Sequence, residues 1–162
     1  MRKKLKKDCQ GFYLLNHGDQ VKPELAPEFA QKSIEINLAI TRGKEKDGVL
    51  NFHGGSSSGY SLFLEDGRPI FCCRLGGELY TFRTSEILPG ERVFLSVNVR
   101  SSGQVSLKRK EKILAKGKLP TLFNTHPQDP LEVGNDTFST LSNYTSSPSF
   151  NGKITEVKLR LK

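Results

Sequence analysis

Apolar and polar residues alternate along several short segments of the chain. The segment 33–40 has isoleucine or leucine at every second position, and 92–100 has valine or leucine at every second position. Because successive side chains of a strand point to opposite faces, each segment is expected to turn one face to a core and one to water. Such half-buried strands are typical of antiparallel sheets.

Turn sequences separate these segments from other short apolar runs. Asp66-Gly67 is a favoured two-residue hairpin turn, and Gly76-Gly77 and Pro89-Gly90 divide the runs that follow. Helical periodicity is nearly absent. The one segment that could form a helical turn, residues 24–31, is shortened by Pro23 and Pro27. The further strands are expected at 48–53, 60–65, 69–74, 78–83, 104–108, 131–133 and 153–159. Some ten strands at regular spacing predict an all-β fold, a two-sheet antiparallel β-sandwich of the jelly-roll type.

The length of 162 residues suits one domain with a core of its own. We expect residues 1–32 to be an N-terminal tail or linker that can wrap the sandwich, and residues 33–162 to be the sandwich domain. The start, Met1–Lys7, is basic, but no apolar stretch follows it, so no secretion signal is expected in this chain. No run reaches the roughly 20 apolar residues of a membrane span, so no membrane partner is expected. The cell compartment stays open, and a longer parent protein could be periplasmic or secreted.

Basic residues give the chain a formal net charge of +8, with 25 Lys and Arg against 17 Asp and Glu. They cluster at residues 1–7 and in the expected hairpin of residues 104–118. Two interpretations stay open: a solvated surface, or a surface that attracts an anionic polymer. Nucleic-acid binding by the hairpin is the weaker form of the second, because no nucleic-acid motif accompanies the charge.

The chemistry-bearing residues do not form a catalytic or metal-binding pattern. Three cysteines occur, and adjacent Cys72 and Cys73 should point to opposite faces of a strand, one into the core and one toward the surface. No serine-nucleophile elbow, zinc-ligand spacing or pair of acids for glycoside hydrolysis is visible. We therefore expect no enzymatic activity and name no catalytic residue.

The last third of the chain carries a resemblance to known domains. Leu131-Glu-Val-Gly-Asn-Asp136 is followed after a polar loop by Phe150-Asn-Gly-Lys-Ile154 and a long terminal strand. This order resembles laminin G-like and concanavalin A-like jelly rolls. Together with residues 48–55 and 59–69 it also resembles, over about residues 30–161, the non-catalytic C-terminal domain of bacterial arylsulfatases. No cysteine has the C-x-P/A-x-R setting of the sulfatase nucleophile, and Ser56–Ser58 replaces a Gly-Arg-Phe-Gly-Gly loop common in that family.

The resemblance implies an accessory domain with one of two functions. The domain could bind carbohydrate, including anionic or sulfated polysaccharide, or position a substrate. Alternatively, it could be a structural domain docked on a sulfatase catalytic domain. Side chains that could stack on a sugar or hydrogen-bond to it are Tyr60, Arg74, Tyr80, Asn135, Asp136 and Tyr144.

Calcium is the one cation that the resemblance implies. Laminin G-like domains often hold calcium at loop tips, and Asp136 is the carboxylate of the matching region. Calcium takes about six to eight oxygen ligands, and this loop offers one carboxylate. The alternative is that Asp136 caps its own turn through its side chain. No other cofactor is expected.

Overall fold

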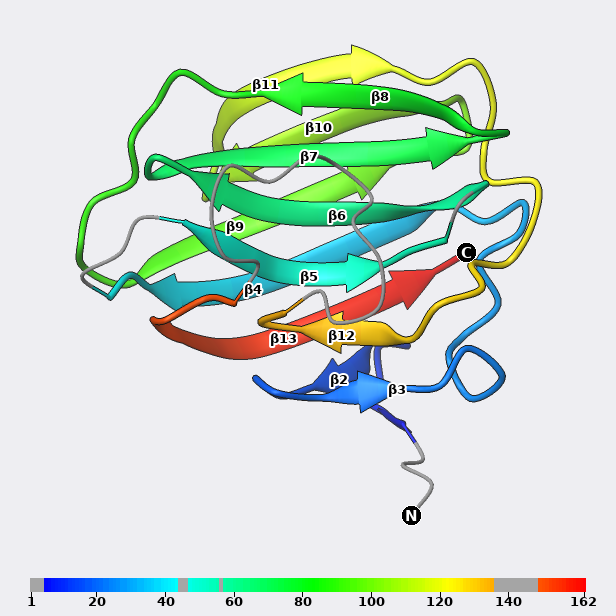
Figure 1. Ribbon diagram of the computed structural model, residues 1–162, viewed down its shortest axis with the longest axis horizontal. Helices are drawn as coiled ribbons and strands as arrows, with labels where there is room; N and C mark the ends of the chain where they lie inside the picture. Colours follow the sequence, from blue (N-terminus) through cyan, green and yellow to red (C-terminus); the bar gives the residue numbers. More distant parts are fainter. Residues whose placement is uncertain (1–4, 44–46, 56, 136–148) are drawn as a thin grey trace.

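The chain folds into two antiparallel sheets packed face to face (Figure 1). The computed structural model describes residues 5–43, 47–55, 57–135 and 149–162, and these contain strands and no helix. Accordingly, none of the described residues forms a helix that could cross a bilayer. The predicted all-β, two-sheet antiparallel sandwich is confirmed. The strands are β1 (Lys6–Lys7), β2 (Tyr13–Leu15), β3 (Gln20–Val21), β4 (Ile34–Thr41), β5 (Gly48–His53), β6 (Ser58–Glu65), β7 (Arg68–Leu75), β8 (Glu78–Arg83), β9 (Val93–Val99), β10 (Gln104–Arg109), β11 (Lys112–Lys118), β12 (Leu131–Val133) and β13 (Lys153–Leu161).

The larger sheet has seven strands in the order β1-β2-β13-β4-β9-β10-β11. Near its centre β13 pairs with β4, so that Ile154, late in the sequence, lies opposite Ile40, which comes early in it. The smaller sheet has six strands in the order β3-β12-β5-β6-β7-β8. Neighbours in sequence form hairpins in both sheets, whereas β12 and β13 return from the end of the chain to pair with early strands.

The turns follow the sequence chemistry. Asp66 and Gly67 join β6 to β7 with φ angles of 54° and 78°, as the mirror-image hairpin turn requires. Gly76 and Gly77 join β7 to β8 in the same way, with φ angles of 55° and 86°. These left-handed conformations match the twist of the flanking strands, so the expected hairpins form.

The core lies between the sheets and takes the apolar face of each alternating strand. Ile36, Leu38, Val97 and Leu95 are buried there from β4 and β9, and the six-stranded sheet supplies Tyr60 and other residues of the same cluster. Segment 22–32, between β3 and β4, adds the fully buried Phe29. The one candidate for a helical turn, residues 24–31, lies in this segment, which holds hydrogen-bonded turns and no helix.

The six-stranded sheet is also buried on its outer face. A second apolar cluster there contains Val49, Phe52, Phe63, Ile70 and Cys72. The expectation that one of the adjacent cysteines lies near the surface is therefore wrong. Cys73 belongs to the main core and Cys72 to the second cluster, so both are buried. Burial raises the pKa of the Cys73 thiol well above its ordinary value.

Residues from the expected N-terminal tail lie at the sheet edges. β1 and β2 continue the seven-stranded sheet beyond β13, and β3 continues the six-stranded sheet beyond β12. Leu15 and Val21 from these short strands are buried in the main core. The segment 6–21 therefore contributes pairing and apolar contacts to the sandwich.

Candidate functional site

Polar side chains form rows across the outer face of the seven-stranded sheet. Register places Arg160, Glu35, Asn98, Ser106 and Lys116 side by side on β13, β4, β9, β10 and β11. All five lie at positions that alternate with core residues, so they share the outward face. At about 4.8 Å between strands, this row is about 19 Å long.

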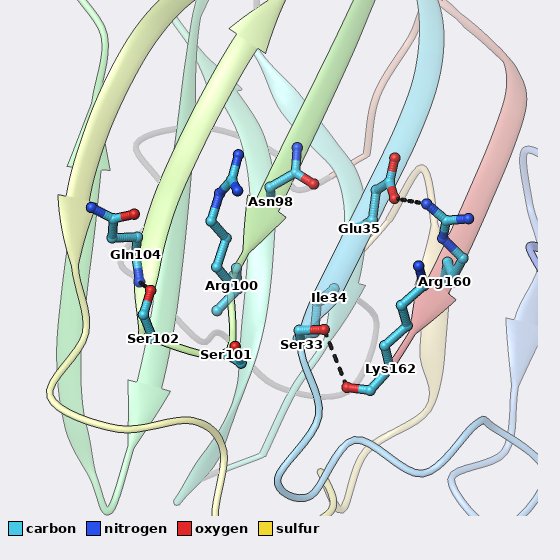
Figure 2. Close-up of a pocket in the computed structure, with 11 residues that line it drawn as sticks. Ser33, Ile34, Glu35, Asn98, Arg100, Ser101, Ser102, Gln104, Arg160 and Lys162 are labelled. Atoms are coloured by element: carbon cyan, nitrogen blue, oxygen red, sulfur yellow. Dashed lines mark hydrogen bonds and ion pairs between the residues drawn. The ribbon is translucent and has the colours of Figure 1, made fainter.

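One end of this row lies in a hollow of about 540 Å³. Its walls come from β4, β13, the end of β9 and the turn between β9 and β10, and Figure 2 shows Glu35 between Asn98 and Arg160. The lining residues are Ser33, Ile34, Glu35, Asn98, Val99, Arg100, Ser101, Ser102, Gln104, Arg160 and Lys162. Two of the eleven are apolar, so hydrogen-bonding groups dominate the surface of the hollow.

Arg160 is held in place by several contacts. Its Nη2 donates to Glu35 Oε1 at 2.6 Å, and its Nη1 donates to the Gln10 carbonyl oxygen at 3.3 Å. Its guanidinium carbon lies 4.3 Å from the centre of the Phe12 ring. Glu35 is held from the other side by Asn37, whose Nδ2 donates to Oε2 at 3.2 Å. These contacts make Arg160 and Glu35 a fixed, charge-balanced part of the floor.

Arg100 and Lys162 are the two exposed cations that line the hollow. Both side chains are exposed, and within the described part of the chain neither forms a hydrogen bond or ion pair. Their backbones are fixed nonetheless. The Arg100 N–H donates to the Gln104 carbonyl at 2.8 Å, and the Ser33 N–H donates to the Lys162 carbonyl at 2.8 Å. Two cations on anchored backbones thus border the hollow with their donors available.

Two further hollows adjoin the first on the same face. One lies over β10 and β11, shares Arg100 and Gln104 with the first, and adds Lys108, Lys116 and Lys118. The other lies over β13, β4 and β9 and is lined by groups that include Lys158, Lys110 and the half-exposed Phe94. Together the three hollows are lined by eight Lys or Arg residues and three glutamates. The face therefore combines positive charge with amide and hydroxyl groups, the donors that bind sulfate, carboxylate and sugar hydroxyl groups.

Tyr60, expected to contact a ligand, is instead a core residue. It has no exposed surface, and its hydroxyl donates to Asn51 Oδ1 at 2.7 Å. Asn51 Nδ2 in turn donates to the Glu132 carbonyl at 2.9 Å, which closes a buried polar chain. Burial raises the pKa of the Tyr60 phenol above its ordinary value. Because Tyr60 points between the sheets, its ring cannot stack on a saccharide in this structure.

Arg74 and Tyr80 lie on opposite faces of the six-stranded sheet. Tyr80 pairs with Cys73, faces inward and is half-buried against the main core. Arg74 faces outward, and its Nη1 donates to the Gly77 carbonyl at 2.8 Å across the β7–β8 turn. The structure does not bring these two residues into one site, because adjacent positions of a strand point apart.

The loop after β12 falls partly outside the described residues. Asn135 is half-buried and lines a hollow of about 360 Å³ with Asp19, Gln20 and Glu132. Asp136, the expected metal ligand, and Tyr144 lie outside the described residues. Within the described ranges no three His, Cys, Asp or Glu side chains gather as a metal site.

Two histidines pack together beside Tyr60. The rings of His53 and His126 lie 5.2 Å apart between centroids, and His53 has no exposed surface. Burial, reinforced by His126, lowers the pKa of His53 to about 3. His126 Nε2 lies 2.7 Å from the Pro23 carbonyl oxygen, and its Nδ1 accepts from the Phe29 N–H at 3.4 Å. The pair therefore fastens segment 22–32 to the rest of the fold.

Comparisons with known proteins identify the fold. No family model matches the sequence, and no curated protein matches it. Among solved structures, domains LG4-5 of the mouse laminin alpha1 chain superpose with a TM-score of 0.66 at 20% identity, covering 98% of this chain and 40% of that one. The chain thus spans less than half of that laminin structure. It has a laminin G-like, concanavalin A-like jelly-roll fold.

Two bacterial domains show the same architecture. The CBM40 of the Ruminococcus gnavus IT-sialidase, bound to alpha2,3 sialyllactose, matches with a TM-score of 0.59 at 12% identity, over 99% of this chain and 90% of that one. Domain 4 of AbnA, a GH43 extracellular arabinanase from Geobacillus stearothermophilus, in complex with arabinotriose, matches with a TM-score of 0.62 at 18% identity. That match covers 96% of this chain and 73% of the arabinanase domain.

Proposed function

We propose that this chain is a non-catalytic accessory domain that binds anionic carbohydrate on the outer face of its seven-stranded sheet. The observation that carries the proposal is the pair Arg100 and Lys162. Both are exposed on fixed backbones, and their side chains have no partner among the described residues. A sulfate or carboxylate group in the adjoining hollow would receive charge-assisted hydrogen bonds there.

The fold comparisons support the carbohydrate part of the proposal. Two domains of this architecture have structures with saccharides, alpha2,3 sialyllactose and arabinotriose. The preference for anionic chains rests on the eight cationic and three acidic side chains that line the three hollows. Exposed cations in a concave surface raise the local concentration of an anionic ligand.

We further propose that the domain belongs to an arylsulfatase-like protein. The support is the order of motifs at residues 48–55, 59–69, 131–136 and 150–154, which resembles the C-terminal domain of those enzymes. Sulfated polysaccharide would then be the ligand class. A purely structural docking role has less support, because polar residues separate exposed apolar side chains on the outer face of the seven-stranded sheet. Leu14 and Ile113, two of the large apolar side chains exposed among the described residues, end a cross-strand row whose other members are Lys158, Asn37, Ser96 and Lys108.

A charge-reversal experiment tests the proposal. The double variant Arg100→Glu/Lys162→Glu should bind dextran sulfate at least about tenfold more weakly than the parent in calorimetry at 50 mM salt. The matched control is Lys22→Glu/Arg83→Glu, which changes net charge equally at exposed positions away from the three hollows. The control should keep affinity within about threefold of the parent, since exposed charges are screened beyond about 10 Å at 0.1 M salt.

Neutral dextran provides the comparison ligand. We expect no measurable binding of dextran by the parent, and weaker binding of dextran sulfate as salt rises from 50 to 300 mM. Equal losses in both double variants would show that net charge alone attracts the polymer. Absence of binding to any sulfated or uronic polysaccharide would contradict the proposed function.

A further inference from the structure

The three hollows on the seven-stranded sheet adjoin one another. The first two share Arg100 and Gln104. The third meets the first where Asn37 donates to Glu35, two positions apart on the same face of β4. It also meets the second, because Ser96 of the third hollow is the register partner of Lys108 of the second. The hollows are therefore parts of one surface.

The far parts of this surface lie at exposed positions. Toward β11 the cross-strand row reaches Lys116, and Lys118 stands two positions further along this edge strand. At the other end of the hollows, on β9, Phe94 is 41% exposed. The guanidinium of Arg92 lies over its ring, 5.0 Å from the ring centre. Neither Lys116 nor Phe94 is enclosed by the described residues, so a long ligand could continue past either one.

Positive charge is spread along the surface and not gathered at one point. The first hollow contributes Arg100 and Lys162, and the second contributes Lys116 and Lys118. In the third, Lys158 is paired with Asp8, 3.9 Å between Nζ and Oδ2, and two lysines face two glutamates. A single acidic sugar could reach only part of this set of cations, because the row alone measures about 19 Å. A chain with a charge on each repeat could contact several of them at once.

Resting on the proposed function, we infer that this surface binds the interior of an anionic polysaccharide chain and does not recognise a chain end. An end-recognising site needs a closed pocket that fits one terminal unit. Here the ligand lies across β13, β4, β9, β10 and β11, along a row of about 19 Å. The ligand class is a linear sulfated or uronic polysaccharide.

A length series of sulfated oligosaccharides tests this inference. Calorimetry with the intact protein should show affinity rising at least about tenfold from the disaccharide to the hexasaccharide, and levelling off by the octasaccharide. Reducing the terminal sugar to an alditol should change the affinity of the octasaccharide by less than about twofold. The variant Lys116→Gln/Lys118→Gln should weaken hexasaccharide binding about threefold or more and leave disaccharide binding unchanged.

The outcomes separate this inference from the proposed function. A disaccharide that binds as tightly as the octasaccharide overturns the interior-chain inference and leaves carbohydrate binding intact. Loss of octasaccharide binding after reduction of its terminal sugar also overturns the interior-chain inference, because the site would then recognise a chain end. If neither the sulfated oligosaccharides of any length nor dextran sulfate bind, both the interior-chain inference and the proposed function are overturned.

Discussion

Removal of the Tyr60 hydroxyl tests whether this residue is structural. In Tyr60→Phe, Asn51 Oδ1 loses the donor that lies 2.7 Å away, at a side chain with no exposed surface. A buried acceptor left without its partner costs about 1–3 kcal/mol. For a domain of this size each kcal/mol lowers the melting temperature by about 2–4 °C. We therefore expect the free energy of unfolding to fall by about 1–3 kcal/mol and the melting temperature by about 2–12 °C.

Urea unfolding at pH 7, followed by tyrosine fluorescence and circular dichroism, measures the loss. The slope with urea should not change, because the variant exposes the same surface on unfolding. Tyr80→Phe is the matched control, since Tyr80 is half-buried and its hydroxyl has no partner among the described residues. We expect that variant to stay within about 0.5 kcal/mol of the parent.

The same variant separates stability from binding. Because Tyr60 has no exposed surface, Tyr60→Phe should keep the parent affinity for sulfated polysaccharide when measured well below its melting temperature. A variant of unchanged stability that binds more weakly would refute this reasoning, because Tyr60 would then have to reach the ligand.

Two other perturbations address the core and the backbone. The pKa of His53 falls from 6.5 to about 3 in the folded chain, so below pH 6.5 the unfolded chain takes up a proton that the folded chain does not. As the pH falls from 6.5 to 3, this residue should lower the free energy of unfolding by about 1.4 kcal/mol per pH unit. The variant His53→Gln should lose this pH dependence. Parallel pH profiles of the parent and the variant in urea unfolding would contradict the reasoning. A methyl group at Gly152 would overlap the backbone oxygen of Thr41. Gly152→Ala should therefore lose about 1–3 kcal/mol in thermal unfolding, whereas Gly90→Ala, whose methyl group meets only Arg42 Nη2 at 3.9 Å, should stay within about 0.5; similar values for both would show that the chain relaxes.

Local patterning predicted β4 and β9 because each has one buried face and one face toward water. In β4 and β9 the alternation of apolar and polar residues reports that face directly. Two features escaped the same reasoning. The strands β2 and β3 have three and two residues, too few to show a period. One of the adjacent Cys72 and Cys73 was expected near the surface, whereas β7 is buried on both faces.

The candidate site was beyond the reach of local patterning. Asn98 and Arg100 alternate with core residues of β9, and Arg160 and Lys162 alternate with core residues at the end of β13. The sequence alone therefore indicates that each pair faces water. What brings them together is the register of β13 with β4 and of β4 with β9, which depends on pairing far along the chain. Tyr60 was misjudged because a tyrosine at a strand position reads equally as a sugar platform or as a core residue with a hydrogen-bonded hydroxyl.

The position of β13 has a consequence for how the protein folds. Its residues leave the ribosome after the other described strands of the sandwich, yet they pair with β2 on one side and β4 on the other. Until then β4 has an unpaired edge and the β1–β2 hairpin has no sheet to join, a state open to wrong strand pairing. Closing the loop from residue 40 to residue 154 also gives the sandwich many non-local contacts, which slows folding. Completion of the seven-stranded sheet is therefore a late event in biosynthesis, and a ribosome-bound chain that lacks β13 would depend on chaperones to keep these edges apart.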